Sequence, residues 1–154
     1  MSIKNIFIIS LLFISCSKRM ATYSSEPYYK LVESISENAE DLKKEVRKSK
    51  VQLEMDFETG DFKGRYKDTD FQGNYIIEHT SAGFAKGFYY RVSLGGLSKG
   101  LSHTSEEEEF FEQLIRCKKI SVIPDKLANP SYIRLELSDN DRKIQLVKFL
   151  KPLE

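Results

Sequence analysis

The sequence predicts an α+β fold: one domain that is mostly antiparallel β-sheet or half-barrel, with one or two helices. Segments in which apolar and polar residues alternate recur along most of the chain, turn residues separate them, and one amphipathic helix with a glutamate-rich start interrupts the series. Because strands joined by short turns favour antiparallel neighbours, we expect about eight strands and one or two helices.

A leader precedes this domain. Lys4 gives a positive start, residues 6–14 form an almost unbroken apolar run, and Ser15 is small. This pattern is typical of a secretory signal peptide over residues 1–15. The run is too short for a membrane span, which needs roughly 20 apolar residues. The sequence that ends in Cys16 resembles the lipobox of bacterial lipoproteins, which implies cleavage before Cys16 and lipidation of its sulfur.

Residues 16–27 are predicted to be the lipidated cysteine and a flexible tether, because the segment is polar and rich in serine. Removal of residues 1–15 from the 154-residue chain leaves 139 residues, enough for one domain with a single core. With Lys4 lost from 24 basic residues, 23 remain against 23 acidic ones. This balance argues against nucleic-acid binding, which requires a basic surface.

The start of the domain, predicted to cover residues 28–154, allows two interpretations. A short strand over 28–33 followed by a helix over 37–49 is the one we favour, because Glu40 and Lys44 have the spacing of neighbours on a helix. A helical pattern that begins earlier is the alternative. Its apolar face is Leu31, Ile35, Ala39, Leu42 and Val46.

From Val51 the pattern changes to β-strands. Alternation over residues 51–58 predicts a strand with one buried and one solvent-exposed face, and a turn is expected over 59–61. The next strand continues to Tyr66, with Gly64 marking a bulge or a close approach. A polar turn that needs a glycine is expected over residues 68–73.

The middle of the chain is rich in aromatic residues. A third strand is expected over residues 75–79, ended by Ser81-Ala82-Gly83, and residues 84–94 are predicted to be extended. The glycines within 95–100 predict a flexible loop.

The clearest helix begins near Thr104. Thr104 with Glu107, or Ser105 with Glu108, forms a capping box, and Glu106–Glu109 lie where the helix dipole favours negative charge. The apolar face that follows is predicted to be core: Phe110, Phe111, Leu114, Ile115 and Cys117.

Three short strands complete the domain. They are expected over residues 120–123, 133–137 and 144–149, with a hairpin loop at 139–141 between the last two. Cys117 is left as a lone thiol if Cys16 is lipidated, and we expect it to be buried.

Several segments carry a family resemblance when taken in order. They are Tyr29-Lys30-Leu31, Leu53-Glu54-Met55-Asp56-Phe57, Gly60, Gly64, Phe71-Gln72-Gly73-Asn74-Tyr75, Glu109-Phe110-Phe111-Glu112-Gln113-Leu114 and the strands from Ile133 to Phe149. Over residues 28–150 this order resembles the META domain of HslJ-like heat-shock lipoproteins. The chain differs at Lys67-Asp68-Thr69, where that family has Gly-Cys-Asn. The resemblance implies an envelope protein linked to stress or drug tolerance, with no established catalytic residues.

Catalytic and metal-binding patterns are weak throughout. Asp68, Asp70 and Gly73 match the start of a calcium loop, but residue 79 is histidine where a bidentate glutamate is required. His79 and His103 have no spacing that suggests a metal site, and Ser102-His103-Thr104 is not a triad. We therefore predict a protein that is not an enzyme and has no cofactor and no metal.

The aromatic residues are the best candidates for a binding surface. Alternation leaves about half of them outside the core, and Tyr75, Phe88, Tyr89 and Tyr90 are the candidates. The predicted partners are the membrane, through the lipid on Cys16, and an envelope protein.

The sequence thus predicts a lipid-anchored protein of the bacterial cell envelope that binds or protects other components, with the periplasmic side of the outer membrane favoured. Two alternatives stay open. One is a periplasmic inhibitor or immunity protein that blocks a toxin or lytic enzyme with the loop 95–100. The other is a metal-binding protein or enzyme that uses His79, His103 and carboxylates.

Overall fold

The computed structural model describes residues 27–30, 39–83, 87–102, 104–126 and 130–150. The predicted signal peptide, Cys16 and the tether up to residue 26 lie outside the described residues, so those predictions stay untested. The elements are β1 (Tyr28–Lys30), α2 (Ala39–Lys48), β2 (Val51–Met55), β3 (Asp61–Tyr66), β4 (Thr69–Gly83), β5 (Gly87–Lys99), α3 (Ser105–Arg116), β6 (Lys119–Pro124), β7 (Tyr132–Ser138) and β8 (Lys143–Phe149).

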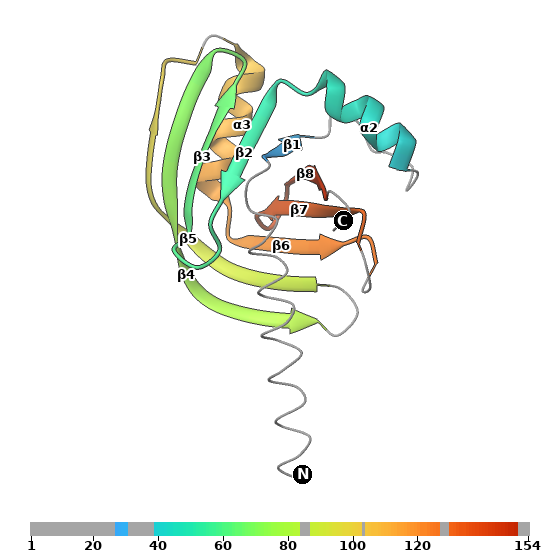
Figure 1. The fold of residues 1–154 in the computed structure, drawn as a ribbon. Coiled ribbons are helices and arrows are strands. Elements are labelled where there is room, and N and C mark those ends of the chain that lie inside the picture. The colour runs from blue at the N-terminus through green and yellow to red at the C-terminus, as the bar shows by residue number, and fades with distance from the viewer. Residues whose placement is uncertain (1–26, 31–38, 84–86, 103, 127–129, 151–154) are drawn as a thin grey trace.

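The sheet curls until its two ends meet (Figure 1). Each strand pairs antiparallel with the next, and β1 also pairs with β8, so the strand order closes into a barrel. The closing contact is short, with Tyr29 opposite Val147 and Lys30 opposite Leu146. The α+β fold, mostly antiparallel and with two helices among the described residues, is confirmed.

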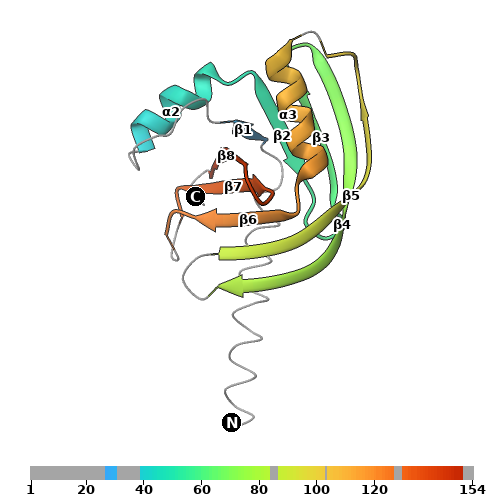
Figure 2. The same cartoon turned by 180° about the vertical axis from the view of Figure 1, so that it is seen from behind.

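The hairpin of β4 and β5 is the longest in the barrel and sweeps around it in both views (Figures 1 and 2). Its ladder has irregularities after Asn74 and after Ile77, and such bulges increase strand curvature. The predicted break at Ser81-Ala82-Gly83 is wrong, because the ladder continues to the Gly83–Gly87 pair.

The predicted flexible loop over residues 95–100 is also wrong. β5 runs to Lys99, and Gly96 pairs with Asn74 of β4. A side chain at Gly73 would collide with the carbonyl oxygen of Gly96 and with the Phe62 ring. Glycine here permits close approach of backbone and ring, a role that composition alone does not distinguish from loop flexibility.

The turns around β3 are short. Gly60 has φ of 81° in the predicted 59–61 turn, and its carbonyl accepts from the Tyr75 amide at 2.9 Å. The polar turn predicted over 68–73 is wrong, because β4 already begins at Thr69 and the turn is formed at Lys67, where φ is 51°.

Helix α3 begins with the Thr104–Glu107 capping box, one of the two predicted alternatives. The Glu107 amide donates to the Thr104 hydroxyl at 3.3 Å, and the Thr104 amide donates to the Glu107 carboxylate at 3.2 Å. The buried face of the helix carries Phe110, Phe111 and Leu114, as predicted. Ile115 was also predicted to be core, and this is wrong: it is 50% exposed, because it lies off the face that packs on the barrel.

These side chains join the main core. We call Tyr66 of β3, Phe71 of β4, Phe110 and Phe111 the aromatic cluster, because their ring centroids lie 5.4 to 6.4 Å apart in tilted or edge contacts. Such arrangements are favourable for aromatic pairs.

Helix α2 packs on the barrel through a smaller cluster. Leu42 contacts Tyr132 of β7 and Val147 of β8, with Val46 and Phe149 beside them.

No helix among the described residues is long and apolar enough to cross a membrane.

Candidate functional site

The barrel contains a cavity of about 980 Å³. This volume lies at the upper end of the range of about 300 to 1,000 Å³ for small-molecule sites. None of the described α3 residues lines it. Residues from seven strands and from the β2–β3 turn line it. The main side chains of its apolar wall are Tyr28, Met55, Phe57, Phe88, Tyr90 and Ile133.

Lys148 brings a charged group to this wall. Its side chain is only 4% exposed, although it lines the cavity. It follows Leu146, a core residue on the same face of β8, whereas Val147 between them belongs to the α2 cluster on the opposite face. The ammonium group of Lys148 therefore lies on the inner side of the barrel, with its nitrogen 5.3 Å from the centroid of the Tyr28 ring.

Tyr28 and Tyr90 add two hydroxyl groups. Burial, with a smaller contribution from Tyr90, raises the pKa of Tyr28 above its ordinary range. Tyr28 is therefore neutral at physiological pH and can donate a hydrogen bond.

Aromatic stacking shapes the apolar part of the wall. The rings of Phe57 and Tyr90 are stacked, with centroids 5.1 Å apart and planes 23° apart. Both side chains are only partly buried and pack against the main core. An apolar wall with a few polar groups is the usual composition of a ligand pocket.

Acidic residues of the β2–β3 turn, Asp56 and Glu58, and Asp61 at the start of β3 lie at the cavity. Asp56 Oδ1 accepts from the amides of Glu58 at 2.8 Å and Thr59 at 3.2 Å, which stabilises the turn. Glu54 forms an exposed ion pair with Lys63 at 3.2 Å. These groups contrast with the buried ammonium of Lys148 because they are exposed or only partly buried.

The four predicted binding residues do not form one surface. Phe88 and Tyr90 line the cavity, as residues two apart in a strand can. Tyr89 does not; its ring lies 4.7 Å from the Lys119 nitrogen. Tyr75 was predicted to be exposed, and this is wrong: it is 1% exposed, and its hydroxyl donates to the Leu114 carbonyl at 2.7 Å.

Sequence reasoning missed the other cavity residues that matter most, namely Tyr28, Phe57 and Lys148. A signal for Lys148 was present, because period-two alternation places it on the same face as Ile144 and Leu146. A charged residue at the third position of an apolar face indicates either a strand end or an interior site. Only the closure of the barrel by β1 distinguishes the two cases.

The weak metal patterns do not converge in the structure. Asp70 is paired with Arg65 across the β3–β4 hairpin at 2.7 Å, which lowers the pKa of Asp70. His79 is an exposed residue of β4, and His103 lies outside the described residues. Within the ranges that the structure describes, no group of three or more histidine, cysteine, aspartate or glutamate side chains could hold a metal ion.

Cys117 is buried, as predicted, at the C-terminal cap of α3. Its sulfur donates to the Lys119 carbonyl oxygen at 3.4 Å. Burial raises the pKa of the Cys117 thiol to about 11, which keeps it protonated at neutral pH. A protonated, buried thiol is a poor nucleophile.

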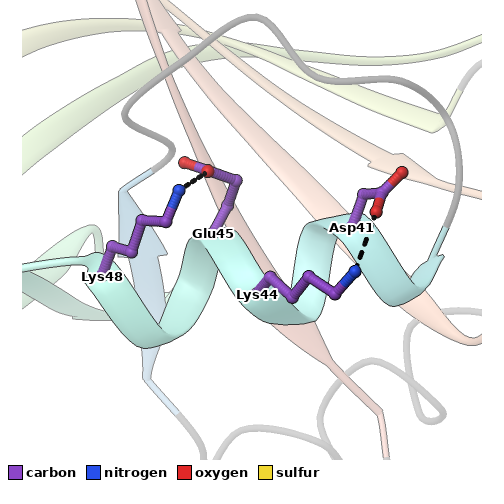
Figure 3. Close-up of polar contacts among 4 residues, drawn as sticks. All are labelled: Asp41, Lys44, Glu45 and Lys48. Carbon is purple, nitrogen blue, oxygen red and sulfur yellow. Dashed lines mark hydrogen bonds and ion pairs between the residues drawn. The ribbon is translucent and has the colours of Figure 1, made fainter.

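Ion pairs on the surface of α2 are shown in Figure 3. Lys48 pairs with Glu45 at 2.7 Å, and Lys44 pairs with Asp41 at 3.6 Å. Glu45 Oε2 and Arg134 Nε are buried atoms without a hydrogen-bond partner among the described residues. Because Arg134 pairs with Val147 in the sheet, both groups belong to the region that α2 covers.

The fold and the cavity together define a barrel with an internal site of small-molecule size. Comparisons of the chain with family models, with curated proteins and with solved structures found no match.

Proposed function

We propose that this chain is a lipid-anchored protein of the bacterial cell envelope whose META-like domain binds other envelope components without catalysis, in a stress-protective role. The observation that carries the proposal is the leader that ends in Cys16, with Lys4, an apolar run over residues 6–14 and a small Ser15. Anchoring by the two or three acyl chains of a bacterial lipoprotein would be stable, whereas a single chain is marginal.

The META part of the proposal is supported by where the resembling segments lie. Residues 53–55 lie in β2, residues 71–75 in β4 and residues 109–114 in α3. The binding part is supported by the cavity, whose wall combines aromatic residues with a few polar groups. The inhibitor alternative requires an exposed loop over residues 95–100, and it loses support because residues 95–99 belong to β5.

The test is the intact mass and membrane partitioning of three proteins expressed in a bacterium: the wild type, Cys16→Ala and Cys117→Ala. The wild type is expected as a membrane-bound species that begins at Cys16 and carries two or three acyl chains. Cys16→Ala should lose this species, whereas Cys117→Ala, which removes the other cysteine, should keep it. Density separation of the membranes then tests the favoured outer-membrane location.

An unlipidated, water-soluble wild type would overturn the anchoring proposal. Loss of the acylated species in both cysteine variants would also count against it, because the effect would then reflect misfolding or missing thiols in general. The two variants therefore separate lipidation at Cys16 from the buried thiol at Cys117.

A further inference from the structure

A buried lysine in the wall of a cavity is the most informative feature outside the leader. Moving an ammonium group out of water is costly unless it is paired or hydrogen-bonded. Most interior positions of this barrel are apolar. Ile133 of β7 lies directly opposite Lys148 of β8 in the sheet. Lys148 therefore places an ionisable group at an interior position that an apolar side chain such as methionine or leucine could fill.

Neutral hydroxyl groups accompany the charge. The Tyr28 ring lies 5.3 Å from the Lys148 nitrogen, and Tyr90 lines the same cavity. An ammonium group and a phenol hydroxyl are both hydrogen-bond donors, and Lys148, Tyr28 and Tyr90 all line the cavity, so the chemistry of this corner suits an anionic group. A carboxylate, with four lone-pair sites on two oxygens, matches such a set.

The remaining wall is suited to an apolar chain. Phe57 and Tyr90 provide a stacked aromatic surface, and Met55, Phe88 and Ile133 continue it. Exposed carboxylates of the β2–β3 turn lie at the same cavity and disfavour additional negative charge on a ligand. The ligand is therefore expected to carry one negative charge rather than two.

We propose that the cavity binds an amphipathic carboxylate, with its head group at Lys148 and Tyr28 and its aliphatic chain against Phe57 and Tyr90. This inference rests on the proposed function, which assigns a binding role to the domain and positions it beside a bilayer that can supply single-chain lipids. It goes further in naming the chemical class of the ligand.

The test uses the full chain in phosphatidylcholine vesicles with photoreactive analogues of dodecanoate and dodecanol. These probes share a chain and differ in the charge of the head group. The wild type should be labelled saturably by the carboxylate probe, unlabelled dodecanoate should compete, and the crosslinks should map to the peptides that contain Phe57 and Tyr90.

Lys148→Met removes the charge and keeps an apolar side chain of similar reach. It should weaken apparent affinity for the carboxylate about tenfold to a hundredfold, the range for one charge-assisted hydrogen bond, and leave labelling by the alcohol unchanged. Lys143→Met is the matched control, since Lys143 lies on the same strand as Lys148 but is exposed and is not among the described residues that line the cavity. It should keep the wild-type affinity.

The proposal is overturned if Lys148→Met keeps the wild-type affinity for the carboxylate, if Lys143→Met loses as much, or if the wild type shows no saturable labelling. Thermal unfolding checks that Lys148→Met is folded. If it is not, the wild-type preference decides, because equal affinity for carboxylate and alcohol contradicts a cationic head-group site. The intact mass of the same sample reports lipidation, so failure of anchoring and failure of ligand binding are distinguished.

Discussion

The two regions inside this barrel use aromatic residues in opposite ways. Around α3, the rings of the aromatic cluster are packed against one another, and Phe110 and Leu114 are fully buried. Around the cavity, Phe57 and Tyr90 are stacked but only partly buried, and about 980 Å³ beside them is not filled by side chains.

This difference separates the stabilising part of the domain from the part available for binding. Removing a ring from an interior packed to crystal-like density lowers the free energy of unfolding by several kcal/mol. Truncating a ring that already borders open space adds little new cavity, so the loss of stability is smaller. Aromatic content alone therefore does not identify a binding site. The distinction lies in whether a second element, here α3, covers the rings.

The largest expected effect is the loss of a ring from the filled region. Phe110→Ala should lower the free energy of unfolding by about 3 to 5 kcal/mol, because a fully buried phenylalanine is replaced by a cavity. Phe57→Ala, at the cavity, should lower it by about half of that or less. Urea unfolding of both variants measures the difference, and equal losses would contradict the distinction between the two regions.

The second prediction concerns the thiol beside the filled region. In a Cys16→Ala background, alkylation of Cys117 at pH 8 should be at least about a hundredfold slower in the folded protein than in urea, because burial raises its pKa from 9.0 to about 11. The group is stabilising in its protonated form below about pH 9. This contribution to stability is lost as the pH rises towards about 11.

Mass spectrometry of the alkylated protein against time measures this rate. Rapid labelling under native conditions would place Cys117 in an open site and extend the accessible region to the end of α3. The pH dependence is compared with that of Cys117→Ala, which keeps the raised pKa of Tyr28. The difference reports Cys117 together with Tyr75, because Cys117 contributes to the raised pKa of Tyr75.

Much of the filled region could be predicted from the sequence. The capping residues of α3, its apolar face and the β7–β8 hairpin all depend on residues close together in the chain, where spacing alone is informative. Buried Cys117 follows from the same helical spacing.

The cavity could not be predicted in the same way, because it depends on strands far apart in the sequence. Tyr28 and Lys148 meet only because β1 closes the barrel against β8. The prediction that Tyr75 is exposed failed for a related reason. Tyr75 of β4 is buried against α3, where its hydroxyl donates to the Leu114 carbonyl, and alternation within the strand does not predict this contact. The strand at residues 95–99 likewise depends on pairing with β4, which overrides the weak strand preference of glycine.

The smallest effect tests how firmly α3 is held in the filled region. Thr104→Ala should lower the free energy of unfolding by about 1 kcal/mol, because it removes the hydroxyl that accepts from the Glu107 amide. Ser105→Ala is the matched control, since the other capping alternative is not the one formed, and it should change stability by less than about 0.5 kcal/mol. Urea unfolding measures both variants. If Thr104→Ala also weakened dodecanoate labelling while the protein stayed folded, the start of α3 would be coupled to the cavity, and the two regions would not be independent.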